Sequence, residues 1–134
     1  MEKDLPKINR GKAIFLALVT ALLMKVFLFD FMITEGISMV PAINSGSILV
    51  VNKLSYGLRL PGSASYLIRW SLPETGDVVV FFAPGGETAV KRCAGIRAGN
   101  SFFMLGDNEK ESYDSRSYGP VPSDHIIGKV LGVK

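Results

Sequence analysis

The chain is 134 residues long, and its 15 Lys and Arg against 12 Asp and Glu give a formal net charge of +3. This length accommodates one modest domain with a short additional segment, and the charge gives no reason to expect nucleic-acid binding. Cys93 is the only cysteine and His125 the only histidine, so neither an internal disulfide nor an ordinary zinc site can form. We therefore expect no metal and no organic cofactor.

The first element is an apolar run over residues 13–29, in which Thr20 and Lys25 are the only polar residues. A helix of about 17–25 apolar residues can span a bilayer, and further apolar residues extend this run to Ile33. The sequence therefore predicts one N-terminal transmembrane helix over residues 13–33. It also predicts contact between this helix and membrane lipid.

An alternative interpretation of the run is a cleaved export signal, but Phe29-Asp30-Phe31-Met32 lacks the small residues of a cleavage site. Orientation follows from the cations that precede the run, which are Lys3, Lys7, Arg10 and Lys12. The positive-inside rule places residues 1–12 in the cytoplasm and residues 34–134 outside it. The predicted location is a cytoplasmic (inner or plasma) membrane, crossed once.

Short apolar segments separated by turn residues follow the anchor and predict a mainly antiparallel β fold. The expected strands are residues 47–51, 77–82, 88–94, 101–105 and 126–133. Residues 54–72 show no clean period and are interpreted as an irregular, apolar-rich loop. This loop either rests on the membrane interface, where Trp and Tyr are favoured, or covers the β domain.

Two residues are candidates for chemistry, Ser38 and Lys91. A serine hydroxyl needs a base within hydrogen-bond reach, and His125, at the start of the last strand, is expected to be solvated or to cap a turn. A lysine can act as the base when burial lowers its pKa. Strand alternation places Lys91 beside the small residues Ala89 and Cys93, with Arg92 on the opposite face. The alternative is that Lys91 and Arg92 form an exposed basic pair on an edge strand.

Three blocks of sequence together resemble the bacterial type I signal peptidases of the S26 family, which use a Ser-Lys dyad. They are Ser38, Met39 and Pro41; Lys91 and Arg92 with Gly95; and Gly106-Asp107-Asn108 with Ser112, Asp114 and Arg116. Residues 76–81 are similar to a further strand of that family. Because residues 95–105 leave room for a turn and one strand, we expect a compact form of the family's antiparallel β catalytic core.

The resemblance implies roles for individual residues. Ser38 is the implied nucleophile and Lys91 its general base, while Ser112 is expected to hydrogen-bond the lysine amine. Asp114 and Arg116 are expected to form an ion pair that shapes the site. The backbone N–H of Ser38 is the implied oxyanion donor. Gly36 lets the chain turn beside Ser38, at a position where some relatives carry a hydroxyl residue as a second donor.

The function implied by the resemblance is a membrane-anchored serine endopeptidase that removes signal peptides from exported preproteins. Ser38 follows the apolar run closely, so we expect the nucleophile to lie near the outer membrane surface. The alternatives are a specialised processing peptidase for pilus or conjugation proteins and a non-catalytic binder of exported chains. A self-cleaving LexA-like repressor is the least favoured, because an apolar anchor stands where such a regulator has its DNA-binding module.

Overall fold

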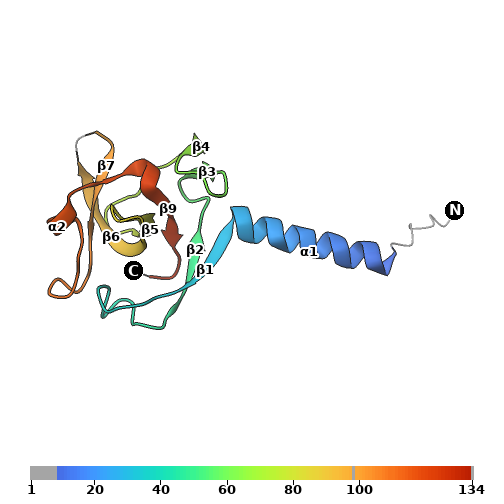
Figure 1. The fold of residues 1–134 in the computed structure, drawn as a ribbon, viewed down its shortest axis with the longest axis horizontal. Helices are drawn as coiled ribbons and strands as arrows, with labels where there is room; N and C mark the ends of the chain where they lie inside the picture. Colours follow the sequence, from blue (N-terminus) through green and yellow to red (C-terminus); the bar gives the residue numbers. More distant parts are fainter. Residues whose placement is uncertain (1–8, 98, 134) are drawn as a thin grey trace.

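The computed structural model describes residues 9–97 and 99–133. One helix leads into a β domain, and the chain ends within that domain (Figure 1). The elements are α1 (Arg10–Phe27), β1 (Phe29–Ile33), β2 (Ile48–Asn52), β3 (Gly57–Arg59), β4 (Tyr66–Arg69), β5 (Val78–Phe82), β6 (Thr88–Arg97), β7 (Ser101–Leu105), α2 (Ser115–Tyr118), β8 (Val121–Pro122), η1 (Ser123–His125) and β9 (Ile126–Val130).

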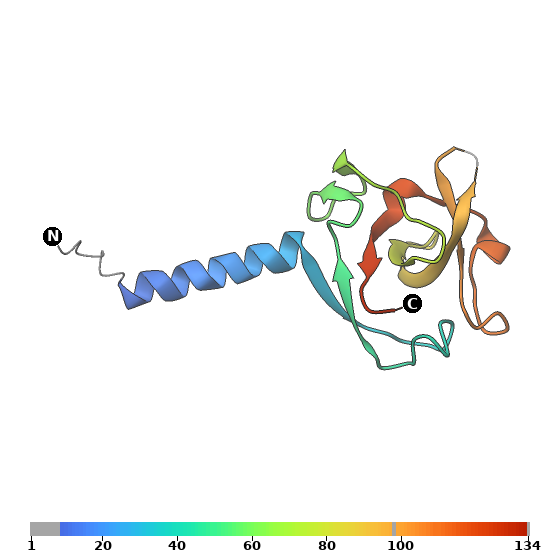
Figure 2. The ribbon, with the colours of Figure 1, turned by 180° about the vertical axis from the view of Figure 1, so that it is seen from behind.

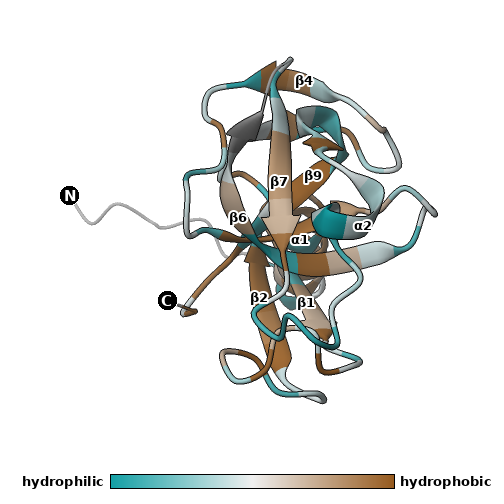
Figure 3. Ribbon diagram, turned by 90° about the vertical axis from the view of Figure 1, so that its left-hand side faces the viewer, coloured by the Kyte–Doolittle hydropathy of each residue, from teal (hydrophilic) through white to brown (hydrophobic). Residues whose placement is uncertain are grey.

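Seven strands form one curled sheet in the order β1-β2-β9-β5-β6-β7-β8, and every pairing in it is antiparallel. The strands are mostly apolar and the connecting loops mostly polar (Figure 3). This arrangement confirms the predicted mainly β fold. Strands β6 and β7 pair antiparallel from Arg92↔Leu105 to Arg97↔Ser101, as a short segment with one further strand requires.

The sheet has apolar clusters on both faces, and β5 contributes to both. Val79 and Phe81 pack into one cluster with Phe102 and Met104, whereas Val78 and Val80 pack into the other. Side chains alternate between the faces of a strand, so a strand buried on both faces is apolar at every position. This explains why residues 78–82 are an unbroken apolar run rather than an alternating one.

The segment after the apolar run differs from the prediction. The helix ends at Phe27, and Phe29–Ile33 form strand β1, which pairs with β2 from Phe29↔Asn52 to Ile33↔Ile48. Tertiary pairing overrides the apolar continuity that suggested one helix over residues 13–33. Within the described residues, no helix combines the length and the apolar character needed to cross a membrane. The proposed cytoplasmic segment falls largely on residues 1–8, outside the described residues.

Strand β1 also changes the expected position of Ser38. The loop that joins β1 to β2 lies at the end of β1 away from α1, as both views of the ribbon show (Figures 1 and 2). A five-residue strand advances the chain by about 17 Å, so the loop is separated from the helix by the length of β1. Closeness in sequence to the apolar run therefore does not place Ser38 beside the helix end.

The predicted irregular loop over residues 54–72 is wrong in part, because it contains the small sheet β3–β4. Tyr56 is buried in the core, and its hydroxyl donates to Asp77 Oδ2 at 2.9 Å. Trp70 is exposed, and its Nε1 donates to the carbonyl oxygen of Leu54 at 3.0 Å. One part of the segment thus covers the β domain, while apolar side chains such as Leu67 remain exposed.

Candidate active site

Ser38 lies in the loop between β1 and β2 and is held from two sides. Met39 and Ile43 are buried in the core, and the backbone N–H of Ile43 donates to the carbonyl oxygen of Met39 at 2.8 Å. From the other side, the backbone N–H of Asn108 donates to the carbonyl oxygen of Ser38 at 2.9 Å, and Asn108 Nδ2 donates to that of Ile37 at 3.1 Å. These contacts fix the backbone that carries the Ser38 hydroxyl.

Lys91 lies on β6 and reaches Ser38. Its Nζ donates to Ser38 Oγ at 2.7 Å, although the two residues are 53 positions apart in sequence. The Lys91 residue is only 6 % exposed, and its Cα partner on β5 is the fully buried Val79. The alternative of an exposed basic pair on an edge strand is therefore wrong for Lys91, because β6 lies inside the sheet, between β5 and β7.

The strand neighbours of Lys91 follow the predicted alternation. Ala89 and Cys93 belong to the core cluster on one face of the sheet, and Val90 packs against the cluster on the other face. Arg92 turns toward the loop after β7, where its Nε and Nη2 donate to the two carboxylate oxygens of Asp107 at 2.9 and 2.8 Å. The cation of Arg92 is thus neutralised away from the amine of Lys91.

Burial lowers the pKa of Lys91, because the charged form loses its hydration when the side chain is enclosed. The carboxylate of Asp114 acts in the opposite direction, since a nearby negative charge favours the ammonium form. Burial is the larger effect, so the amine loses its proton at a lower pH than a free lysine does. A neutral amine 2.7 Å from a hydroxyl can accept its proton.

Asp114 is the fully buried acid of the site, with 0 % of the residue exposed. Burial alone would raise its pKa, but hydrogen bonds from Arg116, the Gly106 N–H and Ser112 outweigh burial and lower the pKa well below the usual carboxyl range. Arg116 Nη2 donates to Asp114 Oδ2 at 2.6 Å and Nε to Oδ1 at 3.0 Å. The ion pair expected between Asp114 and Arg116 is present.

Ser112 does not have the hydrogen bond that the resemblance implies. Its hydroxyl donates to Asp114 Oδ2 at 2.6 Å, and in the described part of the chain the hydrogen bond of the Lys91 amine goes to Ser38. The physical reason is that a buried carboxylate is a stronger acceptor than an amine and requires several donors. Ser112 is thus hydrogen-bonded to the carboxylate whose charge favours the ammonium form of Lys91.

Gly106 allows these groups to approach one another. A Cβ at this position would lie 2.1 Å from Ser112 Oγ and 2.7 Å from the carbonyl oxygen of Ser38. Its own N–H donates to Asp114 Oδ2 at 2.8 Å. A residue with a side chain at position 106 would therefore push Ser112 and Ser38 apart.

A cavity of about 420 Å³ opens in front of the pair and is named here the dyad cavity. One wall comes from β1 and the loop that follows it, and the other from the start of β6. Its lining residues are Met32, Ile33, Thr34, Glu35, Gly36, Ser38, Met39, Ile43, Leu49, Glu87, Thr88, Ala89, Val90, Lys91 and Tyr113. The aliphatic part of the lining, which includes Ile43, Leu49 and Ala89, suits a small apolar side chain placed next to the Ser38 hydroxyl.

Two more predicted residues lie near Ser38. Gly36 lines the dyad cavity with φ of 82°, a backbone conformation that glycine adopts without strain, and a Cβ there would contact nothing within 4 Å. Pro41 follows a cis peptide bond and lines a separate cavity beside Arg92. No acceptor is paired with the backbone N–H of Ser38 among the residues that the structure describes, so this donor is available for an oxyanion.

The imidazole of His125 contacts the end of β5 rather than Ser38 or Lys91. Its Nδ1 lies 3.2 Å from the carbonyl oxygen of Phe82, at the end of β5. Sequence reasoning assigned no role to Asn108, which ties the nucleophile loop to the loop after β7. Its place directly after Gly106-Asp107, in the third family block, was the available signal.

Comparison of the sequence with known proteins identifies the family of the chain. The chain matches the sequence profile of the family described as signal peptidase, peptidase S26, over residues 7–100 and 97–133. It is 31% identical over 137 residues to a signal peptidase I of Pseudomonas fluorescens, with 100% of this chain and 44% of the relative covered. Against a signal peptidase I of Bacillus caldolyticus, identity is 27% over 180 residues, with 97% of this chain and 92% of the relative covered.

A third relative is the mitochondrial inner membrane protease subunit 1 of Schizosaccharomyces pombe, which is 32% identical over 124 residues. This match covers 78% of the chain and 73% of the relative. The chain spans less than half the length of the Pseudomonas relative, whereas it spans nearly all of the Bacillus one. Because the family profile matches nearly its whole length, the chain belongs to the signal peptidase family, peptidase S26.

Proposed function

We propose that the chain is a serine endopeptidase that removes signal peptides from exported preproteins, with Ser38 as nucleophile and Lys91 as general base. The observation that carries this proposal is the 2.7 Å contact between Ser38 Oγ and the Nζ of a lysine that is 6 % exposed. Membership of the signal peptidase family supports the class of reaction. The names of the Pseudomonas and Bacillus relatives support the substrate.

In the proposed first step, neutral Lys91 accepts the Ser38 proton while Ser38 Oγ forms a bond to the carbonyl carbon of the scissile peptide. The carbonyl oxygen becomes negative and takes a hydrogen bond from the unpaired N–H of Ser38. Lys91 then gives its proton to the leaving amine as the C–N bond breaks. An ester between Ser38 and the signal peptide remains.

In the second step, water attacks the ester carbonyl and gives its proton to Lys91. The bond to Ser38 Oγ breaks, and the proton returns to that oxygen. Asp114 stays ionised throughout, because Arg116, Gly106 and Ser112 donate to its carboxylate. Ser112, Asp114 and Arg116 are therefore positioning residues in this scheme, and Asp107 holds Arg92 away from the amine.

The dyad cavity suits substrates with small side chains before the scissile bond. Among the described residues β1 pairs only with β2, so its other edge can bind an extended peptide. The backbone N–H of Phe31 on this strand donates to Asp30 Oδ1 at 2.9 Å and is already occupied. Met32 and Leu49 offer shallow apolar surface for small residues. Such residues precede the cleavage point of signal peptides.

We further propose that α1 anchors the chain in a membrane, with the N-terminus inside and the β domain outside. Its apolar side chains, among them Phe15, Leu18 and Leu22, are exposed, and no residue of the helix is buried by the domain. An exposed apolar surface on all sides of a helix requires an apolar surrounding, which lipid provides. Arg10 and Lys12 at its start favour the cytoplasmic side for this end.

The proposal is tested with the full chain, purified in detergent, and a preprotein that carries Ala at the first and third positions before its cleavage site. We expect cleavage at that site by the native chain and by the control variants Ser117→Ala and Lys110→Met, whose residues are exposed and outside the site. Ser38→Ala and Lys91→Ala are expected to abolish cleavage. Binding of the preprotein without cleavage would favour a non-catalytic binder instead.

The anchor is tested separately in membranes. Extraction with alkaline carbonate should leave the chain in the membrane pellet. Protease added outside sealed cells or spheroplasts should degrade the β domain, whereas protease added only to the cytoplasmic face should leave it intact. Release by carbonate, or protection of the domain from outside, would contradict the proposed anchor and its orientation.

A further inference from the structure

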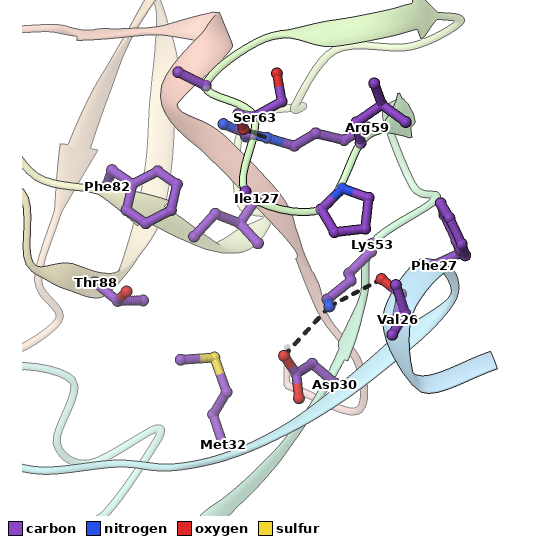
Figure 4. A pocket seen from close by; sticks show the side chains of 14 residues that line it. Val26, Phe27, Asp30, Met32, Lys53, Arg59, Ser63, Phe82, Thr88 and Ile127 are labelled. Atoms are coloured by element: carbon purple, nitrogen blue, oxygen red, sulfur yellow. Dashed lines mark hydrogen bonds and ion pairs between the residues drawn. The ribbon is translucent and has the colours of Figure 1, made fainter. Parts of the chain in front are cut away.

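A second cavity lies between the end of α1 and the dyad cavity. It has a volume of about 390 Å³ and is named here the helix-end cavity. Val26 and Phe27 of α1 lie at one end of it, and Met32 of β1 and Thr88 of β6 lie at the other (Figure 4). The mechanism proposed above makes no use of this cavity.

The two cavities are adjacent, and Met32 and Thr88 line both of them. Asp30, Met32 and Thr34 alternate along the same side of the chain, and Asp30 lines only the helix-end cavity, whereas Thr34 lines only the dyad cavity. The two cavities together, named here the trough, therefore follow β1 from Ser38 to the end of α1. Its opposite wall is formed by the β5–β6 region, through Phe82 and Thr88.

The lining of the helix-end cavity is mainly apolar, and its charged residues are Asp30, Lys53 and Arg59. Met32, Phe82 and Ile127 face it together with the two residues from α1 (Figure 4). The charges of Asp30 and Lys53 offset each other, since Lys53 Nζ lies 3.4 Å from Asp30 Oδ2. The same Nζ donates to the carbonyl oxygen of Val26 at 3.3 Å, which ties the end of α1 to the wall of the cavity.

One buried polar group at this cavity lacks a partner. Arg59 lines the cavity, and its Nε and Nη1 donate to the carbonyl oxygens of Ser63 and Ile126 at 2.8 and 2.7 Å. Its Nη2 is buried and has no hydrogen-bond partner within the part of the chain that the structure describes. Because Nη2 has almost no accessible surface, a bound segment would contact the apolar walls of the cavity rather than this donor.

The distance along β1 sets which part of a substrate reaches the cavity. A chain in extended conformation advances about 3.3 Å per residue, so a peptide that follows β1 from Gly36 to Asp30 passes about six residues. We infer that the helix-end cavity binds an apolar segment of the substrate, about five to eight residues before the scissile bond. This inference rests on the proposed function, because it extends the binding site of the same substrate.

The choice of occupant follows from the adjacency of the two cavities and from the lining of the helix-end cavity. Lys53 is paired with Asp30. The guanidinium of Arg59 donates to two backbone carbonyl oxygens and lies over the rings of Tyr66 and Phe82, so both cations are already held by the chain. An apolar peptide segment fits the aliphatic and aromatic walls that make up most of the lining. The same segment would leave the trough beside α1, which is where a substrate whose own apolar helix lies in lipid must pass.

The test measures binding rather than cleavage, so that it does not depend on turnover. Two fluorescent peptides of equal length carry Ala at the first and third positions before the cleavage point, with either Leu or Ser at positions five to eight. Each is titrated with the full-length Ser38→Ala chain in detergent micelles, and Kd is read from anisotropy. We expect the Leu peptide to bind about tenfold more tightly than the Ser peptide, as filling an apolar pocket gives.

A matched pair of variants distinguishes binding in the helix-end cavity from nonspecific binding of apolar peptides. Ala64→Trp, made in the Ser38→Ala chain, places a large ring in the helix-end cavity, whereas Leu67→Trp places the same ring on an exposed residue that does not line it. Ala64→Trp is expected to remove the preference for Leu, and Leu67→Trp to keep it. The affinity for the Ser peptide should stay within about twofold in both, as for a surface change.

Equal binding of the Leu and Ser peptides by the parent chain would overturn the inference. So would a preference for Leu that survives Ala64→Trp. If Ala64→Trp changed only the binding of the chain to lipid vesicles, the cavity would be assigned to lipid and the inference would also fail. Loss of cleavage in the native chain, with the preference for Leu intact, would instead contradict only the proposed catalysis.

Discussion

Gly106 lies so close to Ser38 that a Cβ at Gly106 would stand 2.7 Å from the Ser38 carbonyl oxygen. That carbonyl also accepts the backbone N–H of Asn108, two residues further along the same loop. The loop after β7 and the loop that carries the nucleophile therefore pack backbone against backbone. The absence of a side chain at position 106 makes this approach possible.

Substitution of Gly106 by Ala is expected to lower kcat/KM for cleavage by about 100-fold. The added methyl group would overlap Ser112 and the Ser38 backbone, and a displacement of about 1 Å at a nucleophile costs about 100-fold in rate. The measurement is kcat/KM for a signal-peptide substrate. Gly11→Ala is the matched control, because this residue lies in α1 and its Cβ would meet Asn9 Oδ1 at 3.4 Å, an ordinary contact. Full activity in Gly106→Ala would show that the approach is not required.

Asp114→Asn should destabilise the β domain by about 1–3 kcal/mol, the range for buried hydrogen-bond donors that lose their acceptor. The donors concerned are the Gly106 N–H and the Ser112 hydroxyl, whereas the guanidinium of Arg116 is exposed and can be hydrated. The measurement is urea unfolding of the full chain in detergent, followed by circular dichroism. Glu109→Gln is the control, since Glu109 is exposed and lies 3.8 Å from Arg116; its effect should stay within about 0.5 kcal/mol.

The same acid gives a pH dependence of stability. Because the pKa of Asp114 is lowered in the folded chain, its stabilising effect is complete above the ordinary carboxyl pKa and is lost as pH falls below it. The difference in unfolding free energy between the native chain and Asp114→Asn should shrink as pH falls below about 4. A difference that is constant from neutral to acid pH would contradict the assigned pKa direction.

The lowered pKa of Lys91 gives the free energy of unfolding a second pH dependence, in the basic range. The pKa of the amine is lowered in the folded chain, so the unfolded chain binds more protons between that pKa and the ordinary value of about 10.4. The free energy of unfolding of the native chain should therefore rise with pH through this window. Lys91→Met removes the titrating group and should lack this part of the rise. An identical pH dependence in the two chains would show that the amine is not desolvated.

Much of the β domain could be predicted from the sequence, because its signals are local. Val78–Phe82 is apolar at every position, and Ser101–Leu105 has the same limits as the predicted strand. Strand β1 could not be recognised, since Phe29–Ile33 continues the apolar character of the helix and becomes a strand only through pairing with β2. The short strands β3 and β4 were missed for a related reason, as three or four residues carry no period.

In the site as well, the sequence predicted which residues come together but not all of their hydrogen-bond partners. Family blocks pointed to Ser38 and Lys91, and burial of Lys91 followed from its small neighbours on the strand. The partner of Ser112 could not be read from sequence, because it depends on competition between a carboxylate and an amine for one hydroxyl. The adjacency of the two cavities was also beyond sequence reasoning, since it joins residues from α1, β1, β5 and β6.

The most direct test of the central claim is the rate at which an acylating, serine-reactive probe modifies Ser38 as a function of pH, read by intact mass. The native chain should be labelled at Ser38 with a rate that rises as pH passes through a Lys91 pKa below that of free lysine, and His125→Gln should give the same profile. Lys91→Met should abolish labelling while the chain remains folded. Labelling of Ser38 in Lys91→Met at the native rate, or a profile that changes with His125→Gln, would contradict Lys91 as the base.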